Sequence, residues 1–435
     1  MVKNIEKICF YHVFIFIGRT TNGRTMTTER LLERFLRYVK LNTRSVFDAP
    51  NYPSSEGQRE FGRLLVTELK AIGLTDVSQD EWGIVMGTLP ATPGYETLPM
   101  ISWCAHMDTS PEASGQNVQP TVIHDYDGQP ITLRGDTTIT LCVVKHPELA
   151  EMCGKTLIVT DGTTLLGADD KAGVAIIMEA IESLCENASS IHGPIRVCFS
   201  CDEETGCGAD HLDPQKLGTA CYTVDGDAGE QINIETFSAA QAIVRVTGQN
   251  CHPGTAKGFM INAVRVLSRF IDLLPRAIAP ETTDERDGFL HPFEMSGDTT
   301  TATAKVLIRD FETPMLQVRG DFLRQIAKTC ELEFPGAKVE VGITEQYLNM
   351  RDELNKDSRS FQLAEQALRN LGKEPIRKLV RGGTDGSRLT AMGVPTPNLS
   401  AGAHCMHSVE EWACLEEMET SVQWLCEIAK LWATL

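Results

Sequence analysis

The sequence predicts an α/β protein with a doubly wound, mostly parallel sheet and an inserted α+β domain of the ferredoxin-like kind. Short apolar runs alternate with segments of helical apolar spacing, which is typical of a sheet built from strand–helix units. This pattern changes near residue 237 and returns near residue 350, so a second unit interrupts the first. We therefore expect residues 26–236 and 350–435 to form one main domain, and residues 237–349 to form a lid.

The bulk composition excludes some classes of partner. At 435 residues, with 42% hydrophobic and 23% charged residues, the chain resembles an ordinary soluble globular protein. Its net charge of −19 argues against nucleic acid or an anionic membrane surface as a partner. The 14 cysteines are scattered through apolar contexts, so we expect a reducing compartment, the cytoplasm.

The first 25 residues are a separate case. Residues 9–18 (CFYHVFIFIG) are apolar but too short to span a bilayer. Met26 opens a segment with helical apolar spacing and has the context of a natural start. We expect residues 1–25 to be an N-terminal extension or a weak targeting segment. Mass spectrometry of the native N-terminus tests this, and a mature chain that begins at residue 1 would contradict it.

The elements of the first part of the main domain follow from periodicity and turn residues. In order, we expect a helix from residue 26, a helix over 58–72 that stops at Gly73, a hairpin over 75–89, strands over 100–105 and 156–161, a helix over 171–188, and strands over 194–200 and 220–224. Residues 111–136 are polar and turn-rich. They predict a surface insertion with short strands at 118–123 and 131–133.

The interrupting segment and the chain after it follow the same rules. The lid is expected to hold strands over 240–246, 301–311 and 337–346 and helices over 262–274 and 314–330. After residue 350 we expect a helix over 358–371, a glycine-rich turn at 381–386, a strand near 395–399 and a helix over 415–431. The order of strands and helices in the lid favours a split β-α-β arrangement.

Acidic and imidazole residues gather directly after five of the predicted strands. The clusters are His106/Asp108, Asp169/Asp170, Glu203/Glu204, Asp225 and His404/His407. Because the carboxyl ends of parallel strands meet at one crevice, we expect all five clusters to converge at the edge of a single sheet. Imidazoles with carboxylates suit divalent metals, above all zinc, and the excess of carboxylates indicates two ions that share a bridging aspartate.

Several of these residues also have simpler interpretations. Asp169 and Asp170 stand before a helix and taken alone are equally typical of a solvated, helix-capping pair. Arg309 beside Asp310 on a strand predicts a surface ion pair. His252 before a proline is most often an ordinary loop residue.

Four motifs resemble the M20 family of dinuclear zinc peptidases. They are HMDT at 106–109, GADDKAG at 167–173, CDEETG at 201–206 and HSVE at 407–410. The longer runs DGTTLLGADDKAG, YTVDGD, HPGTAKG, IRDFE and RGGTDGSRL resemble the branch of that family that acts on tripeptides. The resemblance covers the chain from about Thr27 to its C-terminus.

The resemblance implies a metal centre with two Zn²⁺ per subunit. One zinc would be held by His106 and Asp225, the other by Glu204 and His407, and Asp169 would bridge them. The choice of Asp169 over Asp170 rests on the resemblance, with Asp170 left to cap the following helix. His404 competes with His407, because the turn at 402–407 departs from the family pattern.

The resemblance also implies the other site residues. Glu203 would be the general base, and Asp108 would hydrogen-bond and orient His106. From the lid, His252 would stabilise the oxyanion and Arg309 would clamp the peptide carboxylate. Asn262 is a weaker candidate for a substrate contact.

The implied activity is that of a metallo-aminopeptidase. It would cleave the N-terminal residue from short peptides, preferentially tripeptides, by zinc-hydroxide attack, and would act as a monomer or homodimer. One alternative is another M20-type amidohydrolase, either a dipeptidase or an acyl-amino-acid deacylase. The other is a non-catalytic, metal-dependent peptide-binding protein.

Overall fold

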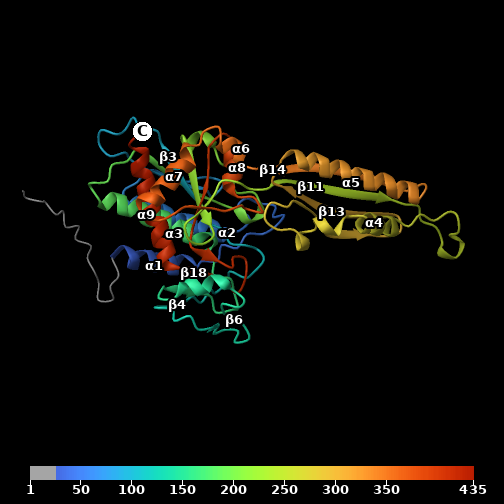
Figure 1. Ribbon diagram of the computed structural model, residues 1–435, viewed down its shortest axis with the longest axis horizontal. Helices are drawn as coiled ribbons and strands as arrows, with labels where there is room; N and C mark the ends of the chain where they lie inside the picture. Colours follow the sequence, from blue (N-terminus) through green and yellow to red (C-terminus); the bar gives the residue numbers. More distant parts are fainter. Residues whose placement is uncertain (1–25) are drawn as a thin grey trace, which may run out of the picture.

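The computed structural model describes residues 26–435, so the expected N-terminal extension lies outside the described residues. The chain forms an α/β body from which an elongated arm projects (Figure 1). Among the described residues, no helix combines the length and the apolar character that a bilayer crossing needs.

A mixed sheet forms the centre of the body and confirms the predicted fold class. Its strands are β1 (Thr75–Gln79), β2 (Val85–Leu89), β3 (Ile101–His106), β8 (Ile195–Ser200), β9 (Ala220–Gly226), β10 (Gln231–Asn233), β15 (Ile376–Arg377) and β16 (Asn398–Ser400). Their order is β1-β2-β8-β3-β9-β16-β10-β15, and the central run from β8 to β16 is parallel. All six residues of β3 are buried, as expected for a strand that is covered on both faces.

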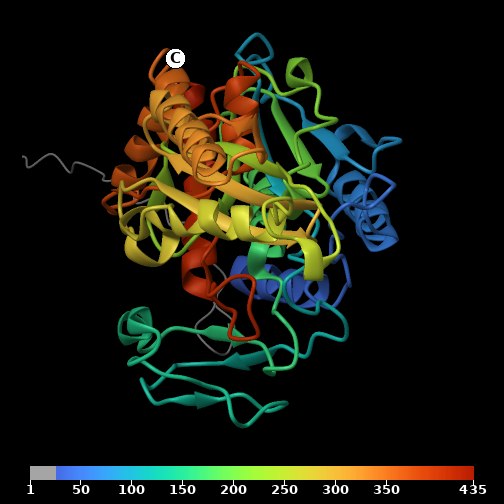
Figure 2. The same ribbon diagram turned by 90° about the vertical axis from the view of Figure 1, so that its right-hand side faces the viewer.

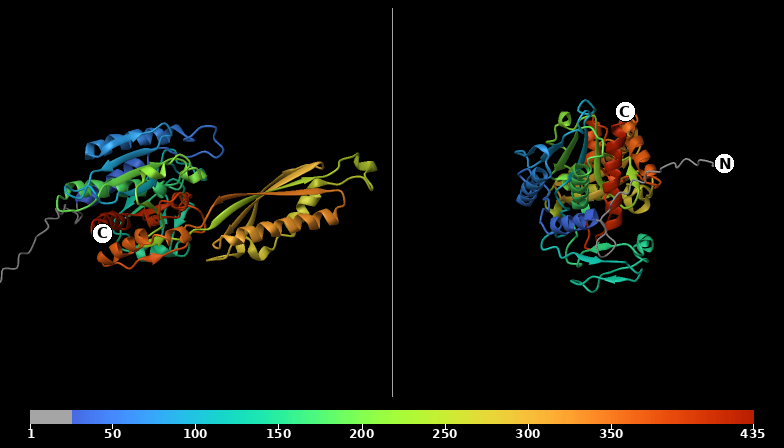
Figure 3. Two further views of the ribbon diagram at one scale, coloured as in Figure 1. Left: turned by 90° about the horizontal axis from the view of Figure 1, so that it is seen from above. Right: turned by 90° about the vertical axis from the view of Figure 1, so that its left-hand side faces the viewer.

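Helices cover both faces of this sheet. The long helices are α1 (Met26–Tyr38), α2 (Glu56–Ile72), α3 (Ala168–Glu186), α7 (Arg359–Asn370) and α9 (Leu415–Trp432). They pack on the face that carries Trp103 and Val197 and form the main core (Figures 1 and 3). The neighbouring residues Cys104 and Cys198 point to the other face, where α8 (Asp385–Ala391) contributes Leu389. The short helix α6 (Arg351–Leu354) precedes α7.

A second, smaller sheet corrects one expectation. It contains β4 (Thr121–Ile123), β7 (Leu157–Val159), β17 (Ala403–His404) and β18 (Trp412–Cys414) in the order β17-β18-β7-β4. The strands that precede Asp169 and His407 therefore lie outside the central sheet, and the prediction that all five clusters follow strands of one sheet is wrong. The physical reason is that β7 pairs antiparallel with β18 and β4, which are remote in sequence and leave no local signal.

The polar insertion lies beside this small sheet. In the structure it extends past residue 136 as far as β7 and adds the hairpin β5 (Ile131–Thr132) and β6 (Thr140–Leu141) and the 3₁₀ helix η1 (Pro147–Met152). Together these segments form a separate layer at the bottom of Figure 2. Tyr126, Leu149 and Trp412 share a small apolar core there, which explains why the insertion is ordered.

The arm is a four-stranded antiparallel sheet with two helices on one face. Its elements are β11 (Ser238–Thr247), α4 (Ala263–Asp272), β12 (Phe289–Gly297), β13 (Thr301–Asp310), α5 (Pro314–Glu333) and β14 (Lys338–Tyr347). The strand order β12-β13-β11-β14 is that of a ferredoxin-like domain (Figure 1). Strand β12 was not expected from the sequence. The exact lid boundaries at residues 237 and 349 remain predictions.

Candidate metal centre

Five side chains converge where the central sheet meets the small sheet. His106 ends β3, Asp225 lies near the end of β9, and Glu204 follows β8 in the 3₁₀ helix η2 (Glu203–Thr205). These three segments are neighbours in the parallel run, so their carboxyl ends meet. Asp169 arrives from the start of α3, and His407 from the loop between β17 and β18.

Asp169 stands between the two histidines. Its Oδ1 lies 2.9 Å from Nε2 of His106, and its Oδ2 lies 3.1 Å from Nε2 of His407. Asp225 Oδ1 is 3.5 Å from the same nitrogen of His106, and Glu204 Oε2 is 2.9 Å from that of His407. The cluster thus has two halves, each with one imidazole and one carboxylate, which share Asp169.

The next residue, Asp170, has different partners. Its Oδ1 accepts a hydrogen bond from the backbone N–H of Gly173, and its Oδ2 accepts one from the N–H of His106, both at 3.1 Å. Asp169 and Asp170 have non-helical dihedral angles, so regular helix begins at Lys171. The peptide bond between the two aspartates is cis. Asp170 therefore caps α3 and holds the backbone of His106.

Asp108 fixes the two glutamates. Its buried carboxylate accepts hydrogen bonds from the backbone N–H groups of Glu203 and Glu204, at 3.1 and 3.2 Å. It also lies 3.4 Å from Nδ1 of His106, which is 3.2 Å from the Asp108 carbonyl oxygen. These contacts direct the other ring nitrogen of His106 toward Asp169.

The cluster crowds carboxylates into a buried volume, which disfavours their charged forms. Burial raises the pKa of Asp225 to about 7 and that of Glu204 to about 8, and the Asp169 carboxylate adds to both shifts. Burial opposes ionisation of Asp169 as well, but hydrogen bonds from both histidines outweigh it and lower the Asp169 pKa. The second carboxylate oxygen of Glu204, Oε1, is buried and has no hydrogen-bond partner. Crowded carboxylates, inward-facing imidazoles and this orphaned oxygen fit divalent cations.

His404 lies elsewhere. Its Nε2 is 2.9 Å from Oε2 of Glu417, and its ring stacks on Trp412 with centroids 3.6 Å apart. The structure therefore brings His407 and not His404 to the cluster.

A cavity of about 570 Å³ lies beside the cluster and includes the base of the arm. Glu203, Glu204 and His407 line it from the body, and Arg309 and Tyr347 line it from the arm. This volume is within the usual range for a small-molecule site.

Arg309 lines this cavity, and its guanidinium is held in place by neighbouring groups. The guanidinium donates to the carbonyl groups of Ala240 and Ile308 at 3.1 and 3.0 Å and lies over the ring of Tyr347. Asp310 pairs with Arg319 at 2.6 Å, so the simpler interpretation of Arg309 as its ion-pair partner does not hold. No carboxylate within residues 26–435 forms an ion pair with Arg309.

His252 and Asn262 are not brought to the cluster. Both belong to the segment between β11 and α4, at the end of the arm away from the body (Figure 1). Nδ1 of His252 accepts from the N–H of Gly254, and Asn262 caps α4 through the N–H of Arg265. In this arrangement they have local structural roles.

Sequence reasoning missed two buried acids. Glu411 accepts hydrogen bonds from the N–H groups of Leu166, Gly167 and Asp169 at 2.7 to 3.1 Å, and so holds the loop that presents Asp169. Burial raises its pKa to about 7. Asp385 lines the cavity and accepts from the hydroxyl of Ser200. One feature of the sequence could have identified Glu411: it forms a pair of adjacent glutamates with Glu410, like the pair at 203–204.

Comparisons with known proteins place the chain in a family. The model of peptidase family M20/M25/M40 matches residues 160–431. Peptidase T of Clostridium botulinum (strain Kyoto / Type A2) is 42% identical over 404 residues, which are 93% of this chain and 99% of the relative. Peptidase T of Geobacillus kaustophilus is 43% identical over 93% of this chain and 98% of its own length.

Solved structures share the fold. The aminopeptidase PepT of Bacillus cereus superposes with a TM-score of 0.72 at 23% identity, over 93% of this chain and 99% of that one. A dinuclear metal-binding M20 peptidase of Bacillus subtilis gives a TM-score of 0.65 at 14% identity, over 94% and 98%. Two relatives match this chain over nearly their full length at more than 40% identity, and the family model covers more than half of the chain. This chain therefore belongs to peptidase family M20/M25/M40.

Proposed function

We propose that this protein is a metallo-aminopeptidase that removes the N-terminal residue from short peptides, preferentially tripeptides. The observation that carries the proposal is the buried cluster in which Asp169 faces His106 with one oxygen and His407 with the other. The relatives named peptidase T support the substrate class. The Bacillus subtilis peptidase described as dinuclear and metal-binding supports two ions.

We propose two Zn²⁺ per subunit as the cofactor. His106 and Asp225 would hold one ion, Glu204 and His407 the other, and Asp169 would lie between them. When bound, such ions lower the pKa of a water molecule and polarise the scissile carbonyl group.

Glu203 is the general base in this proposal. It takes a proton from the attacking water and passes it to the leaving amine. Burial raises the pKa of its carboxyl, and the Asp225, Asp385 and Glu204 carboxylates add to the shift, so Glu203 is a stronger base than an exposed carboxylate. Asp108 acts as a positioning residue, because it holds Glu203 through the backbone N–H.

The arm supplies substrate contacts. Arg309 would clamp the peptide carboxylate with its guanidinium group, which would favour peptides of one length. His252 would stabilise the oxyanion, and Asn262 would make a weaker contact. In the structure both residues belong to the segment between β11 and α4 at the outer end of the arm, where their hydrogen bonds are local.

Replacement of Glu203 tests the mechanism. Glu203→Gln keeps the shape of the side chain but removes its basicity, so kcat for Ala-Ala-Ala should fall about 10²- to 10⁴-fold. Metal content, measured by atomic emission, should not change. Glu345→Gln, on an exposed position of β14 near the cavity, is the control and should keep full activity. Full activity in Glu203→Gln would remove the proposed base.

A substrate panel separates the alternatives. Release of alanine from Ala-Ala-Ala should exceed release from Ala-Ala and from N-acetyl-alanine. Preference for the dipeptide or the acetylated amino acid would identify another amidohydrolase of the family. Tight peptide binding without turnover would identify a binding protein.

We propose a monomer or a homodimer as the assembly. Strand β12 lies at one edge of the arm sheet, so one of its sides has no partner strand among the described residues. The side chains of Phe293 and Met295 on it are 45% and 55% exposed. Such an edge can pair with a second copy. Sedimentation velocity of the protein and of Met295→Lys distinguishes the two states.

A further inference from the structure

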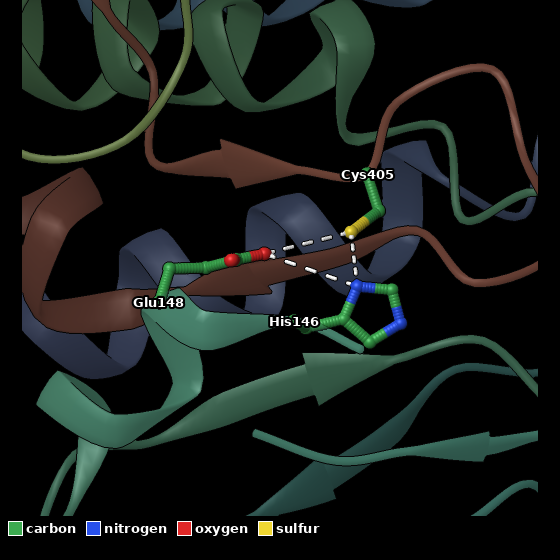
Figure 4. Close-up of side chains that lie close together, drawn as sticks. All are labelled: His146, Glu148 and Cys405. Carbon is green, nitrogen blue, oxygen red and sulfur yellow. Dashed lines mark hydrogen bonds and ion pairs between the residues drawn. The ribbon is translucent and has the colours of Figure 1, made fainter. Parts of the chain in front are cut away.

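Three metal-ligating side chains meet outside the cluster described above. His146 and Glu148 stand at the start of η1 in the insertion, and Cys405 begins the loop after β17 (Figure 4). Cys405 Sγ lies 3.1 Å from Nδ1 of His146 and 3.7 Å from Oε1 of Glu148. The nitrogen and the carboxylate oxygen are 3.9 Å apart. All three side chains point toward one common centre (Figure 4).

The size of this triangle fits one ion. The point equidistant from the three donor atoms lies about 2.1 Å from each, close to the zinc–nitrogen and zinc–oxygen distances of about 2.0–2.2 Å. A displacement of the ion away from the sulfur and out of the plane brings the zinc–sulfur distance toward about 2.3 Å and leaves a fourth position for water. A thiolate, an imidazole and a carboxylate together favour zinc over magnesium or calcium, which prefer oxygen alone.

The imidazole is already oriented for a metal. Nε2 of His146 lies 2.8 Å from Oε2 of Glu410, and Lys145 forms an ion pair with the same carboxylate. A carboxylate on one ring nitrogen keeps the proton there and leaves the lone pair of Nδ1 directed at Cys405 and Glu148. This carboxylate–histidine arrangement is common behind zinc ligands. The His146 side chain is only 9% exposed, whereas Glu148 is 38% exposed and gives an ion access from solvent.

We propose that Cys405, His146 and Glu148 bind a third divalent ion, zinc, separate from the dinuclear cluster. Its ligands would join the insertion to the loop that carries His407 and Glu411. Within that loop the Ser408 hydroxyl donates to the Cys405 carbonyl at 2.7 Å and accepts from the N–H of Glu410 at 3.1 Å. An ion on Cys405 would therefore restrain the loop from which the second histidine of the cluster projects. On binding, the ion replaces the thiol proton, which passes to solvent.

Cobalt(II) provides a specific test, because thiolate–cobalt charge transfer absorbs in the near ultraviolet and the dinuclear cluster contains no sulfur donor. The full-length protein is stripped with a chelator, titrated with Co²⁺ and followed by absorption and by bound metal after gel filtration. We expect a charge-transfer band, and one more equivalent of cobalt in the parent protein than in Cys405→Ser, which should lack the band. Glu148→Gln should keep the band but require about tenfold more Co²⁺ to saturate it.

Cys153→Ser is the matched control, since Cys153 is an exposed thiol in the same insertion. It should behave like the parent protein. The proposal is overturned if the parent shows no thiolate band, which would leave a thiol–imidazole hydrogen bond as the only interaction. It is also overturned if Cys405→Ser keeps the band and the additional equivalent. Both readouts are independent of peptidase activity and of whether the dinuclear cluster fills.

Discussion

At the level of single residues, two adjacent aspartates divide the work of the metal centre. Asp169 contributes its carboxylate to both histidines, whereas Asp170 binds backbone N–H groups of Gly173 and His106. Which of the two aspartates faces the histidines depends on where the chain leaves its extended conformation and where the helix begins. Sequence spacing shows an acidic pair before a helix, but apart from Gly173 the partners of these carboxylates come from residues far along the chain.

Glu411 should control how firmly the metals bind. Glu411→Ala leaves three buried N–H groups of the Asp169 loop without an acceptor, so we expect the affinity of the cluster for zinc to fall about 10- to 100-fold. Competition with a chromophoric chelator measures this affinity. Glu416→Ala is the control, because Glu416 accepts from the N–H of Thr156 and from the Cys414 thiol, away from the cluster. Equal affinities in the two variants would contradict the positioning role of Glu411.

Glu417 gives a pH dependence of stability. Burial opposes its ionisation, but the hydrogen bond from His404 and the charge of Lys155 outweigh burial and lower its pKa below the ordinary value of 4.5. A carboxyl with a lowered pKa stabilises the folded state above its unfolded pKa, and this contribution is lost as the pH falls through the folded pKa. Glu417→Gln should therefore lose about 1–2 kcal/mol relative to the parent at pH 7, and less below about pH 4.5.

Urea unfolding at pH 7 and pH 4 measures this difference. Tryptophan fluorescence reports on the body alone, because all five tryptophans lie outside residues 238–347. A difference that stays constant between the two pH values would rule out Glu417 as its source.

At the level of elements, the sequence predicted the helices and strands whose buried apolar residues recur with a clear period. It missed those without such a pattern. Helix α3 and strand β3 are buried along almost their whole length, and their apolar runs predicted both. Strand β12 escaped because it is an edge strand, exposed over much of its length and interrupted at Pro292. Strands β4 and β7 were expected, but their separate sheet escaped, because its strands have only two or three residues each and β7 pairs with segments remote in the sequence.

An ion-pair network joins two predicted helices. Glu179 of α3 is fully buried and lies 2.7 Å from Nη2 of Arg30 and 2.8 Å from Nη1 of Arg34 on α1. Glu179→Ala removes the shared carboxylate and leaves two partly buried guanidinium groups, so we expect a loss of about 3 kcal/mol. Glu186→Ala, at the half-exposed end of the same network, should cost less than about 1 kcal/mol.

Urea unfolding followed by tryptophan fluorescence measures both variants. If both variants lose equal stability, the buried ion pairs stabilise the fold no more than the exposed pair does. The prediction would then be wrong, and α1 would be held to the body by its apolar face alone.

At the level of the whole molecule, the position of the arm separates residues that the proposed mechanism needs together. Arg309 lies at the base of the arm and lines the cavity, whereas His252 lies at the outer end. The sequence identified both residues but gave no information on their distance from the metal cluster. The orientation of the arm depends on two connecting segments, 234–237 and 348–350, and these short irregular stretches have no periodic pattern.

Closure of the arm is the expected response to substrate. A phosphinic tripeptide analogue should bridge the cluster and Arg309, so the radius of gyration from small-angle X-ray scattering should decrease on binding. The analogue with a C-terminal amide lacks the carboxylate that Arg309 would hold, and it should cause a smaller change at equal saturation. Identical scattering with and without the acid analogue would show that the arm does not close.

The spread of the proposed ligands along the chain has a consequence for synthesis in the cell. His106 leaves the ribosome 301 residues before His407 does. The loop that presents Asp169 also waits for Glu411. A nascent chain therefore carries most of the ligands without the last histidine or the clamp on the bridging aspartate. Peptidase activity can appear only after His407 and Glu411 have been made, so shorter partial products cannot degrade peptides during their synthesis.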